Sequence, residues 1–113
     1  MVKHIILWKL NDELSTEQKK AVKTDIKKNL EALVGVVPGL TKMNIRTEFL
    51  DSSSADIMMD SELESNEALK GYQTHPSHVH VADTYVRPNV SVRLSMDYEI
   101  RSSIMIGKDR AAL

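Results

Sequence analysis

The chain has 113 residues, 42% of them hydrophobic and 27% charged, which is the composition of a single soluble globular domain. Its formal net charge of −1, without a basic stripe interleaved with aromatic residues, argues against nucleic acid as a partner. No apolar run approaches the roughly 20 residues of a membrane span, so we expect no membrane insertion. Cysteine is absent, which excludes disulfides and thiolate chemistry, and no export leader precedes the first predicted strand; both features fit a cytoplasmic protein.

The first predicted elements are a strand and a helix. The strand covers residues 2–10 and is apolar on both faces at its centre, so we expect cover on both sides. One face carries Val2, His4, Ile6, Trp8 and Leu10, and the other carries Lys3, Ile5, Leu7 and Lys9. Ser15 and Gln18 have the spacing of a capping box, which predicts a helix from about Thr16 to Val34, ended by Gly35.

The second half of the chain alternates in polarity and then turns helical. Residues 41–50 and 55–63 are predicted strands, and Ser65 is expected to cap a short helix after them. Pro76 suits the first turn of another short helix, which ends before Pro88. A last strand is predicted over residues 90–99.

The element order β-α-β-β-α-β predicts an α+β, ferredoxin-like protomer. In that fold an antiparallel four-stranded sheet carries its helices on one face. We expect one domain over residues 1–100 and a C-terminal tail over residues 101–113. Ile104 and Ile106 in the tail fit a short edge strand or an arm onto a partner, and disorder is the alternative.

The two faces of this sheet lead to a prediction about assembly. We expect one apolar set under the helices, namely Val2, His4, Ile6, Trp8, Ile45, Ile57, Met59, Val92, Leu94 and Met96. On the open face Ile5, Leu7 and Met58 lie among the charged or polar residues Arg46, Asp60, Arg93 and Ser95. A second copy packed face to face would cover the apolar centre and give a homodimer. A mixed, solvent-exposed face is the alternative.

Three side chains form the candidate chemical cluster. His4 lies on the helix side of its strand by parity, and Tyr72 and His78 lie on inward faces of their helices. Tyr and His both move protons near neutral pH, so these residues are candidates for one pocket between helices and sheet, with Tyr85 at its edge. The alternative for His4 is a buried, neutral, hydrogen-bonded imidazole without chemistry.

A metal site made of His75, His78 and His80 fails on geometry. Two residues along a helix correspond to a rotation of about 200°, so His80 faces away from His78, and no acid or thiol completes a tetrahedral set. His75 is expected to be a loop or helix-capping residue. The sequence shows no phosphate-cradling glycine loop, nucleophile elbow or dinucleotide fingerprint, so it predicts no metal and no cofactor.

Three segments of the sequence carry a family resemblance. Val2-Lys3-His4-Ile5-Ile6-Leu7, Val36-Val37-Pro38-Gly39 and Tyr72-Gln73-Thr74-His75-Pro76-Ser77-His78 resemble the stress-responsive dimeric A/B barrel domain, often called Dabb, in the right order over residues 1–99. The resemblance implies a ferredoxin-like protomer and a homodimer whose two sheets form a barrel.

One plant branch of that family cyclises linear polyketides by intramolecular aldol condensation. In that branch the Tyr and the second His of the segment act in general acid–base catalysis, which the resemblance places on Tyr72 and His78, with His4 as the N-terminal pocket His. Ile57 stands where the cyclases have another His, and Ile26 and Leu30 replace a pocket Tyr. Trp8, Ile57 and Tyr85 are the further residues expected around a ligand.

Two functional interpretations follow. The first is a stress-responsive A/B barrel protein of unknown specific activity, a homodimer with a small-molecule pocket whose polar residues satisfy one another. The second is a cofactor-independent acid–base enzyme in which His78 takes a proton next to a carbonyl while Tyr72 stabilises the enolate oxygen. The expected ligand in either case is a small apolar or carbonyl-containing molecule, and the fold alone does not choose between them.

Overall fold

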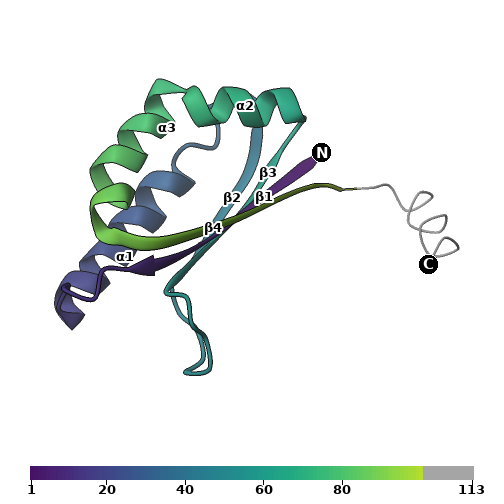
Figure 1. The fold of residues 1–113 in the computed structure, drawn as a ribbon. Helices are drawn as coiled ribbons and strands as arrows, with labels where there is room; N and C mark the ends of the chain where they lie inside the picture. The colour runs from purple at the N-terminus through teal and green to yellow at the C-terminus, as the bar shows by residue number, and fades with distance from the viewer. Residues whose placement is uncertain (101–113) are drawn as a thin grey trace, which may run out of the picture.

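The structure is a computed structural model that describes residues 1–100. Its elements follow the predicted order β-α-β-β-α-β (Figure 1). In chain order they are β1 (Val2–Leu10), α1 (Thr16–Glu31), β2 (Leu40–Arg46), β3 (Ile57–Leu63), α2 (Asn66–Thr74), α3 (Pro76–Val81), a π-helical segment (Ala82–Val86), a 3₁₀ turn (Arg87–Asn89) and β4 (Val90–Glu99). The expected tail over residues 101–113 lies outside the described residues.

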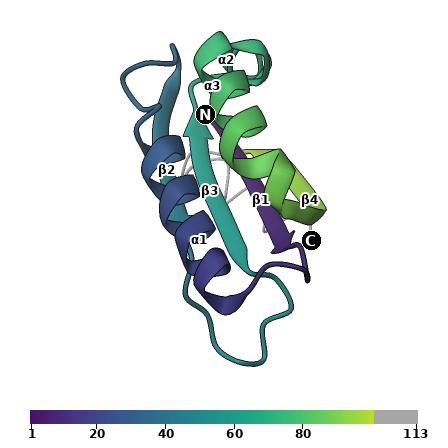
Figure 2. The same ribbon diagram turned by 90° about the vertical axis from the view of Figure 1, so that its left-hand side faces the viewer.

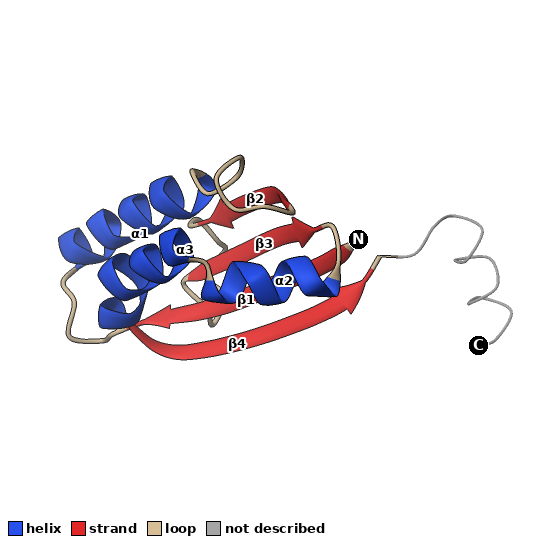
Figure 3. Cartoon of the chain, turned by 90° about the horizontal axis from the view of Figure 1, so that it is seen from above, coloured by secondary structure: helices blue, strands red, loops and turns tan. Residues whose placement is uncertain are grey.

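Within residues 1–100 the strands form one sheet in the order β2-β3-β1-β4, with every neighbouring pair antiparallel. The helices all lie against the same face of this sheet (Figures 2 and 3). This arrangement confirms the ferredoxin-like α+β prediction. It also leaves the second face of the sheet without cover from any described element (Figure 1).

Helix α1 begins as the capping box predicts. Ser15 Oγ accepts from the Gln18 amide at 3.1 Å, and Gln18 Oε1 accepts from the Ser15 amide at 2.8 Å. The helix ends at Glu31, so the expected end at Val34 is wrong. The last turn tightens instead, and the chain leaves through Gly35, whose φ of +87° favours glycine.

A second glycine brings α2 close to the sheet. Gly39 has a φ of +80°, and a Cβ added there would lie 2.6 Å from the Cβ of Ala68 in α2. Only glycine allows this approach without displacing the helix. The contact fixes the height of α2, and therefore of Tyr72, above β1 and β3.

Strand β4 is turned over relative to the prediction. Residues directly opposite each other on neighbouring strands point to the same face. The cross-strand pairs are His4 with Asp97, Ile6 with Ser95, Trp8 with Arg93, Ile5 with Met96, and Leu7 with Leu94. The expectation that Leu94 and Met96 lie under the helices is therefore wrong, and so is the placement of Arg93 and Ser95 on the open face. Val92, opposite Lys9, is also exposed and only borders the cavity between helices and sheet.

The open face is consequently more apolar than the sequence suggested. Leu94 is 63% exposed and Met96 66% exposed in the protomer, and Leu7 of β1 lies between them and β3. By contrast, the inward residues of β1 and β3 are buried, and Ile57 is fully enclosed. The sheet thus has a closed core on one side and an uncovered apolar surface on the other.

Candidate functional site

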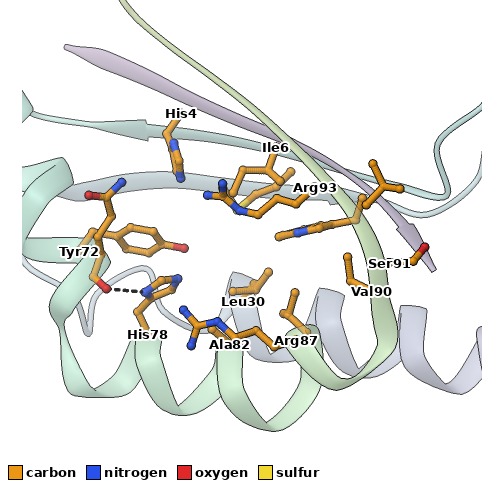
Figure 4. A pocket seen from close by; sticks show the side chains of 15 residues that line it. His4, Ile6, Leu30, Tyr72, His78, Ala82, Arg87, Val90, Ser91 and Arg93 are labelled. Carbon is orange, nitrogen blue, oxygen red and sulfur yellow. Dashed lines mark hydrogen bonds between the residues drawn. The ribbon is translucent and has the colours of Figure 1, made fainter. Parts of the chain in front are cut away.

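A cavity of about 450 Å³ lies between the helices and the β1–β4 side of the sheet (Figure 4). Its walls come from β1, β3 and β4 on one side and from α1, α2, α3 and the π-helical segment on the other. The volume falls within the range of small-molecule sites, which is roughly 300–1,000 Å³. Ile6, Leu30 and Met59 supply apolar walls, and a small number of polar side chains converge on the remaining space.

Tyr72 presents its hydroxyl to this cavity (Figure 4). The residue sits on α2, whose N-terminus is capped by Ser65 Oγ accepting from the Ala68 amide at 3.1 Å. Tyr72 is 1% exposed, and its hydroxyl has no hydrogen-bond partner among residues 1–100. Burial raises the pKa of this phenol, against a weaker opposite effect of the Arg93 charge, so it remains protonated at neutral pH.

His78 stacks beside Tyr72. The two ring centroids are 4.1 Å apart with the planes tilted by 34°. His78 Nδ1 lies 3.3 Å from the Gln73 carbonyl oxygen, so Nδ1 carries the proton and Nε2 keeps its lone pair (Figure 4). Burial lowers the pKa of His78 below its ordinary value, opposed by the Gln73 carbonyl and assisted by the Arg87 charge. The imidazole is therefore neutral at pH 7 and able to accept a proton.

The start of α3 explains how His78 is placed. His75 Nδ1 accepts from the Ser77 amide at 3.1 Å, and Pro76 occupies the first turn. This agrees with the expected capping role of His75. His80 is exposed and does not line the cavity, although it lies only two residues from His78 along the helix. The three histidines therefore face different surroundings, as the rotation along the helix requires.

His4 closes the cluster from the sheet side. It is 2% exposed, and its ring lies 6.0 Å from the Tyr72 ring in an edge-on orientation of 69°. His4 Nδ1 contacts the carboxylate of Asp97 on β4, and the His4 carbonyl accepts from Ser61 Oγ at 2.7 Å. Asp97 thus holds the His4 ring with its other nitrogen toward the cavity (Figure 4).

Two arginines enter the cavity that the sequence analysis did not assign to it. Arg93 comes from β4, opposite Trp8 on β1, and Arg87 from the turn that follows the π-helical segment. Figure 4 shows both guanidinium groups directed toward the space beside Tyr72 and His78. Arg87 forms an ion pair with Asp83 one turn earlier. The cavity is therefore positively charged as well as partly apolar.

Four of the expected site residues come together in the structure and two do not. His4, Trp8, Tyr72 and His78 line the same cavity. Ile57, opposite Trp8 on β3, is fully buried in the core and does not line the cavity. The expectations that Ile57 and Tyr85 line the pocket are corrected accordingly.

Tyr85 lies outside the cavity, and not at its edge as expected, because of the π-helical segment. A spacing of seven residues aligns Tyr85 with His78 on an α-helix, but residues Ala82–Val86 form the wider π turn. Tyr85 packs, partly buried, against the core, while Ala82, Val86 and Arg87 face the cavity. The irregular turn thus selects which side chains reach the site.

The described part of the chain contains no candidate metal centre. Within residues 1–100 no three His, Cys, Asp or Glu side chains gather where they could hold a metal ion. No described helix has the length and apolar character needed to cross a bilayer. The cavity and the open face of the sheet are therefore the candidate functional surfaces of residues 1–100.

The fold and the cavity together define a ferredoxin-like α+β domain with a polar cluster between sheet and helices. The model of the family "Stress responsive A/B Barrel Domain" (Dabb) matches residues 2–100. The chain belongs to this family, which confirms the resemblance seen in the sequence. No curated protein matches the chain.

Solved structures that are similar to this chain share its ferredoxin-like fold. A dimeric protein of unknown function with a ferredoxin-like fold from Bacteroides fragilis is 30% identical, with a TM-score of 0.82 over 88% of this chain and 95% of that chain. A dimeric ferredoxin-like protein of unknown function from Thermobifida fusca is 22% identical, with a TM-score of 0.70 over 88% and 90%. The hydroxynitrile lyase from Passiflora edulis is 17% identical, with a TM-score of 0.67 over 90% and 94%, and shares the fold.

Proposed function

We propose that this protein binds a small carbonyl compound in the cavity and removes a proton from the carbon next to the carbonyl, without a cofactor. The observation that carries the proposal is the Tyr72 hydroxyl, which is buried at the cavity wall without a hydrogen-bond partner among the described residues. An unsatisfied buried hydroxyl costs about 1–3 kcal/mol. A ligand carbonyl oxygen would satisfy it.

The neighbouring His78 supplies the base. Its Nε2 lone pair takes the proton from the α-carbon, the C–H electrons form the enolate, and the developing negative charge on oxygen is stabilised by the hydrogen bond from Tyr72. A neutral imidazole and a protonated phenol are the states this step needs, and burial favours both. Protonated His78 then returns its proton to the enolate or to an alkoxide formed by aldol addition.

His4 has a supporting role in this proposal. The carboxylate of Asp97 holds the proton on His4 Nδ1, which leaves the second ring nitrogen free to accept a hydrogen bond from a ligand. The proposal therefore places the carbonyl oxygen of the ligand at the Tyr72 hydroxyl and a hydroxyl group, such as the enol of a dicarbonyl compound, at His4. Ile57, where the plant cyclases have another His, is sealed in the core, so the proposal extends to enolisation and aldol chemistry and not to a particular polyketide.

We also propose that the working form is a homodimer through the open face of the sheet. The support is the row of exposed apolar side chains on β4 next to Leu7, together with solved relatives of this fold that are described as dimeric. Burial of this surface stabilises by about 25 cal/mol per Å² of apolar area. Each protomer would keep its own cavity on the opposite face.

The test of the proposed activity is hydrogen–deuterium exchange at the α-carbon of phenylacetone, a neutral ketone, followed by proton NMR in D₂O. The protein should accelerate loss of the methylene signal above the buffer rate. His78→Ala should reduce that acceleration by about 100-fold or more, the usual contribution of a positioned base. His80→Ala, on the exposed side of the same helix, is the matched control and should keep full activity.

The result also separates the two interpretations. Exchange that is absent in the wild-type protein, while phenylacetone shifts the amide signals of cavity residues, would reject catalysis and leave a binding protein. Exchange that survives His78→Ala would reject His78 as the base.

A further inference from the structure

The charge of the cavity points to a more specific class of ligand. Among the described residues that line it, none is acidic, while two are arginines. Arg87 already has the Asp83 carboxylate as a partner. Arg93 forms no ion pair within residues 1–100. The cavity therefore contains one guanidinium group whose charge is not balanced by a neighbouring carboxylate in the described chain.

Arg93 is also near the candidate chemistry. Its side chain projects from β4 into the space that Tyr72 and His78 face (Figure 4). Its positive charge acts on both groups, lowering the pKa of the Tyr72 phenol and of the His78 imidazole against the larger effects of burial. A ligand that reaches Tyr72 can thus reach Arg93 as well.

We propose that the ligand of this cavity is an organic carboxylate whose carboxylate group binds Arg93, with its carbonyl oxygen at Tyr72 and the carbon next to the carbonyl at His78. The inference rests on the proposed function and adds a substrate class to it, that of an oxo-carboxylic acid. A planar guanidinium matches a carboxylate through two parallel hydrogen bonds. Ile6, Leu30 and Met59 provide apolar walls for the carbon skeleton, which an inorganic phosphate would not use.

Arg93 reaches the cavity because of the register in which β4 pairs with β1. The alternation of the sequence predicts Arg93 on the open face, where its charge would belong to the dimer interface. The pairing of Arg93 with Trp8 instead puts it on the helix side, next to the cavity. The same register brings Asp97 to His4, so that this carboxylate holds an imidazole and forms no ion pair with Arg93.

The experiment compares two probes of the same shape, 4-phenylbutanoate and 4-phenylbutanamide, by NMR titration of the full-length protein. The wild-type protein should bind the carboxylate about 10-fold more tightly or better, since hydrogen bonds to charged groups are the stronger class. Arg93→Met should abolish this preference, and Arg93→Lys should keep part of it. Lys70→Met, an exposed charge on α2 outside the cavity, is the control and should leave the preference unchanged.

Several outcomes would overturn the inference. Equal binding of the two probes, no binding of either, or a preference that survives Arg93→Met would each reject it. Inorganic phosphate that displaces 4-phenylbutanoate with equal affinity would show a general anion site instead. Phenylacetone exchange without a carboxylate preference rejects this inference alone, whereas a preference without exchange rejects the proposed catalysis and keeps the carboxylate site.

Discussion

Strands β1 and β4 are neighbours in the sheet, yet β1 carries apolar side chains on both faces, whereas the central part of β4 carries them on the open face alone. On β1 the helix side holds Ile6 and Trp8 and is closed by the core. On β4 the helix side holds Arg93, Ser95 and Asp97, and the apolar Leu94 and Met96 point to the open face. The two strands pair residue by residue, so this reversal occurs within a single antiparallel ladder.

The reversal links the two functional surfaces of the molecule. Because β4 turns its polar residues inward, the cavity at its side gains a guanidinium and the carboxylate that holds His4. Because the same strand turns its apolar residues outward, the open face becomes a surface suited to a second protomer. One choice of register therefore supplies both the polar pocket and the proposed interface.

The largest expected effect comes from a charge on the outward side of β4. Leu94→Asp would bury a carboxylate against apolar neighbours in a dimer, so we expect the dimer dissociation constant to rise by about 100-fold or more. Light scattering at micromolar concentration should then report the monomer mass, where the wild-type protein gives twice that mass. Ser95→Asp, the next residue on the same strand but on the helix side, is the matched control and should remain dimeric. A monomeric wild-type protein would contradict the proposed interface on the open face of the sheet.

The inward side of the sheet is tested by Ile57→Ala on β3. The side chain is fully enclosed, so its truncation should lower the free energy of unfolding by about 2–5 kcal/mol. Urea unfolding at one fixed protein concentration measures the change, because dimerisation links stability to concentration. Leu50→Ala, at a position 81% exposed, should change it by no more than about 0.5 kcal/mol. If Ile57→Ala is equally mild, Ile57 is not a core residue and its exclusion from the cavity fails.

Features that depend on local sequence patterns could be predicted from the sequence, and features that depend on strand pairing or on irregular turns could not. The capping box at Ser15, the strand parity of His4 and the helix phase of Tyr72 and His78 are local patterns, and each is present in the structure. The gathering of these three side chains could therefore be predicted once the fold was identified.

The missed residues depend on signals that are not local. Asp97 and Arg93 reach the site through the pairing of β4 with β1, and alternation shows only that a strand has an apolar side, not which way it faces. When a sheet has apolar residues on both faces, the apolar side of a strand no longer shows which face lies under the helices. Arg87 reaches the cavity and Tyr85 misses it because of a π turn that no periodic pattern reveals.

A smaller effect on stability is expected at the unsatisfied hydroxyl. Tyr72→Phe removes a buried polar group that has no partner in the described protomer, so the free energy of unfolding should stay the same or rise by up to about 1–3 kcal/mol. The same variant should lose the acceleration of phenylacetone exchange, because the enolate oxygen loses its donor. Tyr85→Phe, outside the cavity, should keep that acceleration. A clear loss of stability in Tyr72→Phe would mean that the hydroxyl has a structural partner.

The smallest effect concerns the pH dependence of stability. Burial, the largest cause, holds the pKa of His78 below its ordinary value of 6.5, so the unfolded chain binds a proton more readily than the folded one. The contribution of neutral His78 is complete above pH 6.5 and is lost as the pH falls toward the lowered pKa. The free energy of unfolding should therefore rise as the pH increases from below the lowered pKa toward 6.5.

His78→Gln should flatten that rise, because glutamine keeps the polar shape and does not titrate in this range. His80→Gln removes an exposed histidine from the same helix and should leave the slope unchanged. His4 and Asp97, which face the cluster from the sheet, stay in place in both variants, as do Arg87 and Arg93. If the slope persists in His78→Gln, the burial of His78 is not the source of the pH dependence, and the neutral state assigned to this imidazole loses its support.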